Sequence, residues 1–273
     1  MTTHHRSPAT TLRTWILGRE LRHLMTNAGH TNNTLARHLG WLPSTLSRYL
    51  NGQRHIPPAD LVHLLIACGH TNRSDRDQLL ALAADHHTPH HWHDHHDTGL
   101  YANTLYDLEH DCSAITHYSP MALPDILHTP EHHRALLATT PLVPADTIPA
   151  RLATHRARAA ILTGAAPPTV TVILTDLALH TTPQDQLRHL HTLATHPNIT
   201  IHVLPHPHLA APHLAAPFQL LHTTSRRTVL HLPLHNSHLY TEQPHTIRAY
   251  ETLLAHLHPH THPFDHHTLR VFA

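Results

Sequence analysis

The segment TNNTLARHLGWLPSTLSRYLNG, residues 31–52, decides the fold of the first part of the chain. Thr31 is a preferred helix N-cap residue, Gly40 can adopt the positive φ that ends a helix, and Pro43 can open the next helix. Small Ala36 lets two helices approach closely, and leucines on the same face lock their crossing. The segment therefore predicts two short helices that meet across a tight turn.

Helical patterns continue on both sides of this pair. Apolar residues recur at helical spacing from Trp15 to Ala28, and Gly29 then stops the helix. Downstream, PPADLVHLLIACG and SDRDQLLALAAD each combine a polar start with an apolar stripe. Five helices are therefore predicted within residues 1–85.

Charge and composition also set this part of the chain apart. Residues 1–85 contain nine Arg and five acidic residues, a formal charge of +4, and the rest carries −4 because the whole chain is formally neutral. The chain has 40 His, and none of its 18 basic residues is Lys. A basic first part suggests a polyanionic partner there.

The outward-facing side chains of the second helix in the pair suit DNA. Short hydroxyls and one guanidinium on an exposed helix face can reach base edges and phosphates in the major groove, and the amides at the helix start can bind a phosphate. The alternative is a helical bundle whose exposed face happens to be polar. The candidate DNA-binding residues are Thr31, Asn32, Pro43, Ser44, Thr45, Ser47, Arg48 and Arg54.

The pattern changes in the second part of the chain. Three segments predict helices: TGLYANTLYDLEHDCSAITHYSP (98–120), TPEHHRALLATT and PARLATHRARAAIL. The β-branched runs TVTVILTD (169–176) and NITIHVLP (198–205) flank the helical QDQLRHLHTLATH, which predicts a βαβ unit with parallel strands. FQLLHTT and TVLHLPL predict an antiparallel hairpin, and PHTIRAYETLLAHLH predicts a terminal helix.

These elements place the chain in the class α + α/β. The prediction is an N-terminal five-helix helix-turn-helix domain at 1–85, a His-rich linker at 86–98, and a mixed α/β domain at 99–273 that binds a ligand or a partner. The α/β domain contains the βαβ unit and the β-hairpin.

The first domain resembles a known family. WILGRELRHLMTNAGHTNNTLARHLGWLPSTLSRYLNGQRHIPPADLVHLLIACG resembles the Xre/Cro-like helix-turn-helix family, whose usual motif is T-Q-x-x-L-A-x-x-L-G-x-S-x-x-x-x-S-R-x-E-x-G. The chain departs from it at Asn32, Leu42 and Leu50, where the family usually has Gln, Ser and Glu. The matching positions are Thr31, Leu35, Ala36, Leu39, Gly40, Ser47, Arg48 and Gly52.

The second domain also resembles a family. LYDLEHDCSAITHYSPMALPDILHTPEHHRALL is similar to a block found in large actinobacterial regulators that join this helix-turn-helix to a domain of unknown function numbered 5753. The resemblance implies a transcriptional regulator that is encoded beside small partner proteins and has no established enzymatic activity. The chain departs from the family block at Asp125, His128 and His133, where Gly, Gln and Tyr are usual.

Histidines crowd the predicted linker, where HHTPHHWHDHHD (86–97) packs seven of them around Trp92. In the similar family this segment is a basic linker, and His also occurs throughout the predicted strands and helices, so we predict neither a metal site nor a cofactor. Adventitious binding of Zn²⁺, Ni²⁺ or Cu²⁺ is the alternative. Cys68 and Cys112 are far apart and are expected to be reduced and buried.

The predicted function is that of a sequence-specific DNA-binding transcriptional regulator whose second domain senses a small ligand or a partner protein. A homodimer on double-stranded DNA is expected, because one small helix-turn-helix reads only a half-site. A small partner protein encoded nearby is a further candidate. Alternatives are an enzyme built on the α/β part, and a metal- or pH-responsive binder with weakened DNA binding.

No catalytic residue is predicted, and the chain is not expected to be an enzyme. Glu109 and Asp111 are expected on one helix, two residues apart and pointing different ways, and the phospholipase-D-like motif needs a Lys that the chain lacks. No apolar run approaches the ~18 residues that span a bilayer, and MTTHHRSPATT has no signal-peptide core. We therefore expect a cytoplasmic protein without a membrane partner.

Overall fold

The computed structural model describes residues 11–84, 92–94, 103–206, 212–234, 237–265, 268 and 271–272. The chain separates into two compact units, Met1–Trp92 and His93–Ala273, and each is described by itself. Of the predicted linker at 86–98, residues 86–91 and 95–98 lie outside the described residues, so the structure leaves this prediction and the question of metal binding there untested.

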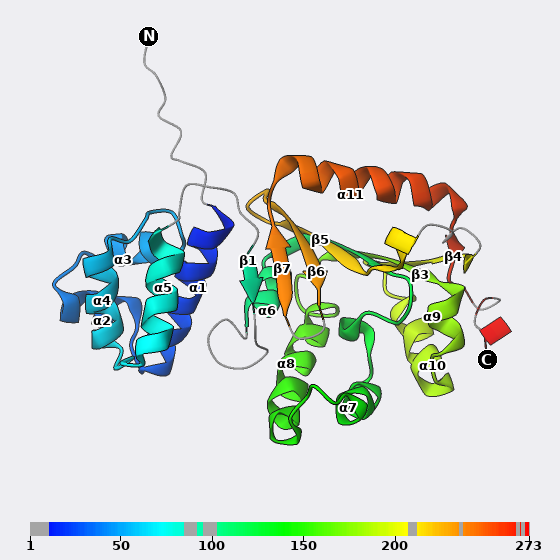
Figure 1. The fold of residues 1–273 in the computed structure, drawn as a ribbon, viewed down its shortest axis with the longest axis horizontal. Helices are drawn as coiled ribbons and strands as arrows, with labels where there is room; N and C mark the ends of the chain where they lie inside the picture. Colours follow the sequence, from blue (N-terminus) through cyan, green and yellow to red (C-terminus); the bar gives the residue numbers. More distant parts are fainter. Residues whose placement is uncertain are drawn as a thin grey trace, which may run out of the picture. The chain divides into compact units, whose positions relative to one another are not determined.

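The first unit contains the five predicted helices (Figure 1): α1 (Leu12–Asn27), α2 (Asn32–Leu39), α3 (Pro43–Leu50), α4 (Pro58–Ala67) and α5 (Arg73–Ala84). The residues predicted to begin and end α2, and to begin α3, do so in the structure. The Thr31 hydroxyl and Thr34 form a capping box at the start of α2, and Gly40 ends α2 at φ +70°. Pro43 is the first residue of α3.

Close packing of α1 against α3 depends on Gly18. A Cβ atom at this position would lie 2.6 Å from the backbone oxygen of Leu50, so only glycine permits this approach. Around the contact, Leu21, Leu35 and Leu46 are fully buried. These leucines, on α1, α2 and α3, are part of the buried core of the first unit.

The second unit is built on an eight-stranded mixed sheet with the strand order β1-β7-β6-β5-β2-β3-β4-β8. β2, β3 and β4 are parallel, and the pairs β2–β5, β5–β6 and β6–β7 are antiparallel. Both the predicted βαβ unit, β3–α10–β4, and the predicted β5–β6 hairpin are confirmed. The strands are β1 (Trp92–Asp94), β2 (Cys112–Ser119), β3 (Thr169–Thr175), β4 (Ile199–Leu204), β5 (Phe218–Thr223), β6 (Thr228–Pro233), β7 (His238–Thr241) and β8 (His262–Pro263).

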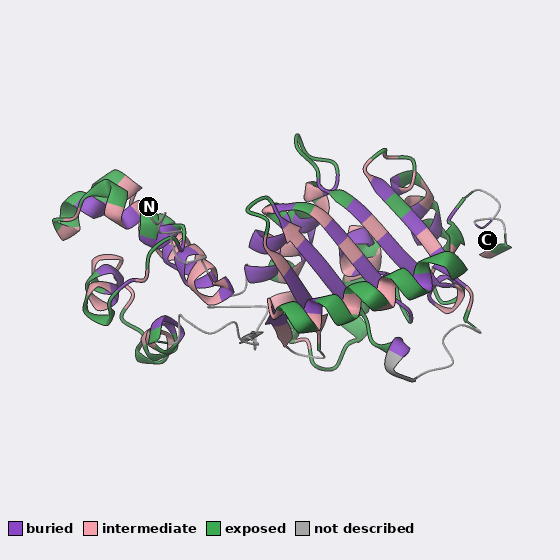
Figure 2. Cartoon of the chain, turned by 90° about the horizontal axis from the view of Figure 1, so that it is seen from above, coloured by how far each residue is buried: buried purple, intermediate pink, exposed green. Residues whose placement is uncertain are grey.

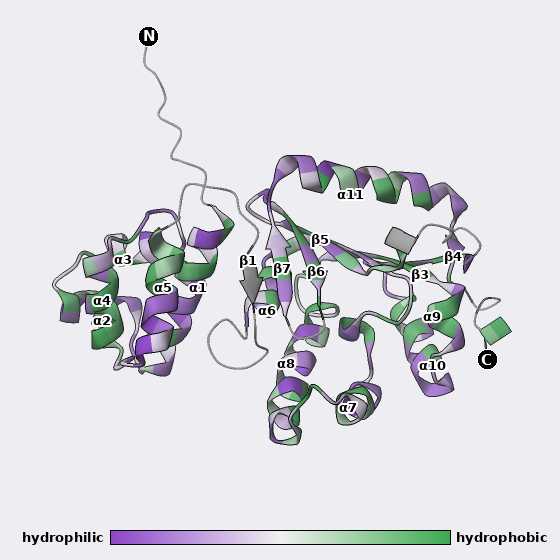
Figure 3. Ribbon diagram, in the orientation of Figure 1, coloured by the Kyte–Doolittle hydropathy of each residue, from purple (hydrophilic) through white to green (hydrophobic). Residues whose placement is uncertain are grey.

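Helices cover both faces of the sheet (Figure 1). α11 (Pro244–Leu257) lies on one face, where Ile247 and Leu257 pack on Tyr118 and Phe218. Figure 2 shows α11, exposed on its outer side, crossing in front of largely buried strands, and Figure 3 shows hydrophobic and hydrophilic residues alternating along it. The other face carries α7 (Pro130–Thr139), α8 (Ile148–Ile161), α9 (Asp176–His180) and α10 (Gln184–Leu193).

One predicted helix is wrong. Residues 98–120 were predicted as a single helix, but α6 (Thr104–His110) is followed at once by β2, a central strand of the sheet. Because neighbours cover both faces of β2, it lacks the clean alternation of apolar and polar residues that marks a half-exposed strand. Buried His117 adds to the ambiguity, since a polar residue occupies an interior position. Neither α9 nor β7 was predicted from the sequence.

Both cysteines are free, as expected, although only Cys112 is fully buried and Cys68 is half-buried. The Cys112 thiol donates to the Leu108 carbonyl oxygen at 3.1 Å. Within the described part of the chain, no helix is both long enough and apolar enough to cross a membrane.

Candidate functional site

The predicted DNA-binding residues gather on α2, α3 and the turn between them. Ser44 and Arg48 are exposed on α3, and Thr45 and Ser47 are partly buried beside them. Arg48 makes no ion pair with any described residue, so its guanidinium is available to a phosphate or a base edge. Arg54, beyond the end of α3, holds its guanidinium carbon 5.5 Å from the centroid of the Tyr49 ring.

Two of the predicted residues serve the local fold. The Thr31 hydroxyl accepts a hydrogen bond from the Thr34 amide and caps α2. The Asn32 side-chain amide donates to the Pro43 carbonyl oxygen at 3.1 Å, and this bond ties the start of α2 to the start of α3. Asn32 therefore braces the motif at the position where the similar family usually has Gln.

The sequence analysis missed the support behind Ser47. The Asn51 side-chain amide donates to the Ser47 hydroxyl at 3.3 Å, and the Arg22 guanidinium donates to the side-chain oxygen Oδ1 of Asn51 at 2.6 Å. This chain of contacts links α1 to the exposed end of α3. Ser47, on the candidate DNA-reading face, is the last residue of this chain of contacts.

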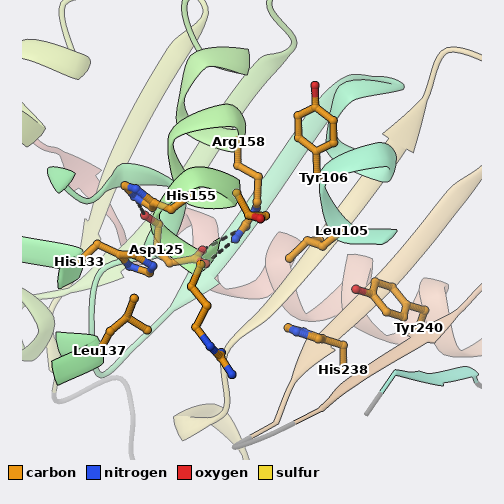
Figure 4. A pocket seen from close by; sticks show the side chains of 11 residues that line it. Leu105, Tyr106, Asp125, His133, Leu137, His155, Arg158, His238 and Tyr240 are labelled. Carbon is orange, nitrogen blue, oxygen red and sulfur yellow. Dashed lines mark hydrogen bonds and ion pairs between the residues drawn. The ribbon is translucent and has the colours of Figure 1, made fainter. Parts of the chain in front are cut away.

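A second candidate site is a pocket in the α/β unit, with a cavity of about 150 Å³. It lies between α6, α7, α8, the short 3₁₀ helix η1 (Asp125–Leu127) and β7. In Figure 4, Asp125, His133 and His155 lie on one side, and His238 and Tyr240 on the other. The lining residues are Leu105, Tyr106, Asp125, His133, Leu137, Arg151, Thr154, His155, Arg158, His238 and Tyr240.

A buried ion triad forms one wall of this pocket. The Arg158 guanidinium donates to Glu109 through Nε at 2.6 Å and Nη2 at 2.8 Å. The same guanidinium donates to both oxygens of Asp125, with the Nη2–Oδ1 contact at 3.1 Å. The Glu109 side chain is fully buried, and 39% of the Asp125 side-chain surface is exposed. Two carboxylates thus face one cation.

Burial and pairing shift the pKa values of this triad. Burial would raise the pKa of Asp125, but the Arg158 charge and hydrogen bonds hold it well below its usual range. Burial raises the pKa of Glu109 despite its contact with Arg158. The two carboxylates raise the pKa of Arg158 well above its ordinary value, against the opposing effect of burial, so the guanidinium stays charged.

Histidines surround the triad and are kept neutral. Burial lowers the pKa of His117, His128 and His133 to about 4 in each case. The His133 ring stacks on His155, with centroids 4.1 Å apart, and His155 Nε2 lies 3.0 Å from the Asp125 carbonyl oxygen. Neutral imidazoles offer hydrogen-bonding groups without adding charge.

A row of polar side chains crosses the sheet beside the pocket. The strand register pairs His117 with Gln219, Gln219 with His231, and His231 with Tyr240, and all four are buried. The buried atoms His117 Nε2, Gln219 Oε1 and His231 Nδ1 have no hydrogen-bond partner among the described residues. Buried polar atoms without a protein partner are uncommon in folded proteins, and an ordered water or a ligand can satisfy them.

The sequence analysis found this site only in part. Asp125 and His133 stood out as departures from the similar family, but Glu109, His155 and Arg158 were not predicted as site residues. Glu109 was instead dismissed as one of a divergent pair with Asp111. One usable signal was missed: Arg151, His155 and Arg158 recur at i, i+4 and i+7 and so share one face of α8.

The histidine arrangement does not form a metal centre among the described residues. His128 Nδ1 and His133 Nδ1 are 3.3 Å apart, but no group of three potential ligands converges anywhere in the described part of the chain. A protein metal site normally needs at least three such ligands. The cluster is therefore better understood as a hydrogen-bonding network.

The first unit defines the class of protein. Residues 16–79 match the family model of a helix-turn-helix domain, which agrees with the α2–turn–α3 geometry and identifies a DNA-binding regulator. Residues 102–266 match the model described as Domain of unknown function (DUF5753). This match spans more than half of the chain, so the chain belongs to the DUF5753 family. The two matches confirm the domain combination that the sequence resemblance predicted. No curated protein matches the chain.

Proposed function

We propose that this regulator binds a specific double-stranded DNA site as a homodimer, and that its α/β unit senses a small ligand or a partner protein. The observation that supports DNA reading most directly is the exposed face of α3, with Arg48 and Ser44 outward and Ser47 held by Asn51. Arg and Ser side chains on such a helix can contact guanine edges and phosphates in the major groove.

The proposal includes an Xre/Cro-like mode of DNA binding and an actinobacterial, cytoplasmic setting with a small partner protein encoded nearby. A dimer fits the proposal because a single helix of this size reads only a few base pairs. Binding, rather than catalysis, is proposed for the pocket of the α/β unit, because Asp125, the carboxylate that lines it, is already engaged by Arg158.

Selection of bound fragments from a random DNA pool tests sequence specificity. The full chain, in EDTA to remove metals carried by the histidines, should enrich a palindromic or directly repeated site with half-sites spaced by about one helical turn. Light scattering of the complex would then give the number of chains per site. Enrichment of no common sequence would contradict specific reading.

Sensing is tested on the site obtained in that selection. A sensed ligand binds the α/β unit with different affinity in the DNA-bound and the DNA-free protein. Because coupling between two sites is reciprocal, the ligand then changes the affinity of the protein for DNA. The measurement is the DNA dissociation constant with and without saturating ligand. An unchanged constant would contradict sensing while leaving DNA binding intact.

A further inference from the structure

The pocket of the α/β unit is large enough to hold one six-membered aromatic ring. Its cavity of about 150 Å³ is comparable to protein cavities that hold a single benzene molecule. Leu105 and Leu137 supply apolar walls, and Tyr106 and Tyr240 supply aromatic ones. These walls suit the flat, apolar body of a small organic molecule.

The hydrogen-bond network fixes which nitrogen of His133 carries a proton. His128 Nε2 lies 3.1 Å from the Leu123 carbonyl oxygen, which can only accept, so Nε2 of His128 is the donor. Burial keeps His128 neutral, so its Nδ1 has a lone pair and accepts from His133 Nδ1 at 3.3 Å. His133 Nε2 is then an acceptor, on a ring that lines the pocket.

Like the acceptor nitrogen of His133, the charged groups of this wall favour a ligand that donates hydrogen bonds. Arg158 shares its single positive charge between Glu109, which is fully buried and does not line the pocket, and Asp125, which does. Only Asp125 is partly exposed, and its ring neighbours His133 and His155 carry no compensating charge when neutral. A hydrogen-bond donor with a positive charge is the natural complement to this wall.

Arg151 supplies the opposite polarity at another point of the lining. It lies on α8 seven residues before Arg158, about 10 Å away along the helix axis. Its Nε donates to the Thr147 hydroxyl at 3.2 Å. Arg151 would bind an anionic ligand, whereas Asp125 would bind a cationic one. The charge of the ligand that binds therefore distinguishes the two residues.

We propose that the pocket binds a compact organic cation of the amine, amidine or guanidine class, with its charged nitrogen against Asp125 and His133 and its apolar body between Leu105, Leu137 and Tyr106. The assignment names the ligand class for the sensing that we proposed above, and it rests on that function for its biological role. Asp125 and His133 set the specificity of the pocket for this class of ligand.

Three isosteric probes test the assignment on the full chain: benzamidine, benzamide and benzoate, which share one ring and differ in charge. Isothermal titration should give saturable binding of benzamidine, at least about tenfold tighter than that of benzamide or benzoate. Equal or tighter binding of benzoate, or no saturable binding of any probe, would overturn the proposal. Benzoate binding that is lost in Arg151→Gln would identify an anion site instead.

Variants locate the bound cation. Asp125→Asn should weaken benzamidine binding at least about tenfold, because it removes the exposed negative charge. Glu251→Gln is the matched control, since it removes a carboxylate on the exposed side of α11 and should leave binding unchanged. His133→Phe keeps the stacked ring, removes the acceptor nitrogen and should also weaken binding, which keeps the test decisive if Asp125→Asn does not fold.

Two readouts separate this proposal from the proposed function. Benzamidine binding that is lost in Asp125→Asn but retained in Glu251→Gln supports the ligand site, whatever happens at DNA. The DNA dissociation constant with saturating benzamidine then tests sensing alone. Equal loss of benzamidine binding in both variants, or no loss in Asp125→Asn and His133→Phe, would overturn the ligand site.

Discussion

At the scale of single residues, Arg158 connects three separate elements of the α/β unit, because it lies on α8 and pairs with Glu109 on α6 and Asp125 on η1. It is 6% exposed and satisfies two carboxylates from elements 33 and 49 residues away in the chain. Arg158→Met would leave Glu109 and Asp125 facing each other without a cation. Removing one partner from a buried ionic network typically costs about 3–5 kcal/mol.

We therefore predict that Arg158→Met lowers the free energy of unfolding by about that amount. Urea unfolding followed by circular dichroism measures this free energy. Arg156→Met is the control, because Arg156 is exposed on the same helix, and its substitution should change stability by less than about 0.5 kcal/mol. Equal effects of the two substitutions would show that the triad does not stabilise the fold.

The same residues show why the pocket was only partly predictable. Local signals in the sequence reach a few residues along the chain, whereas Glu109 and Asp125 meet Arg158 only after β2, α7 and α8 have packed. Asp125 and His133 were noticed because they differ from the residues usual in a similar family. Arg158 gave no such contrast, and a buried arginine is indistinguishable in sequence from one on a solvated helix face.

At the scale of elements, α1 and α3 form the contact on which the candidate DNA-reading face depends. Gly18→Ala would place a methyl group 2.6 Å from the Leu50 backbone oxygen, so α3 has to move away from α1. Overpacking of this kind costs about 1–3 kcal/mol. We expect a lower thermal unfolding midpoint for the first unit and weaker DNA binding.

Gly164→Ala is the matched control for this substitution. Its added Cβ would meet the Ala160 carbonyl oxygen at 3.3 Å, which needs a shift of only a few tenths of an ångström. Scanning calorimetry of both variants measures the difference. A Gly18→Ala protein as stable as the Gly164→Ala protein would mean that α1 and α3 are not in close contact.

Elements also differ in how well the sequence predicted them. Thr31 and Gly40 cap the two ends of α2, and Pro43 opens α3. Because these effects are local, α2 and α3 could be predicted closely. β2 could not, because its position between β5 and β3 is decided by distant strands, and its interior side chains include His117. Tertiary position, and not local propensity, makes Cys112–Ser119 a strand.

At the scale of the whole molecule, the buried histidines predict a loss of stability in acid. The pKa values of His117 and His128 are lowered by burial to about 4, against about 6.5 in an unfolded chain. Between these values the unfolded state binds more protons, so the free energy of unfolding falls as the pH falls. The stability contributed by the neutral buried imidazoles is complete only above about pH 6.5.

Burial also lowers the pKa of His133 to about 4 and that of His231 well below its usual range, so both add to this loss of stability in acid. The pKa of Asp125 is depressed by Arg158, so its contribution is lost only below about pH 4, and the raised pKa of Glu109 opposes the histidines as a single group. Two pKa units correspond to about 3 kcal/mol for each fully buried imidazole. Urea unfolding at about pH 7 and pH 4.5 should show a loss of several kcal/mol, and a constant free energy would contradict it.

The measurement that tests the account most directly is a fluorescence anisotropy titration of the selected DNA site with three proteins: the unchanged chain, Arg48→Ala and Arg73→Ala. Arg73 is exposed on α5, so its substitution removes the same charge away from α3. We predict that Arg48→Ala costs about 1–3 kcal/mol of binding free energy and that Arg73→Ala costs much less. Equal weakening by both would show that binding depends on net charge alone, and would contradict the reading of DNA by α3.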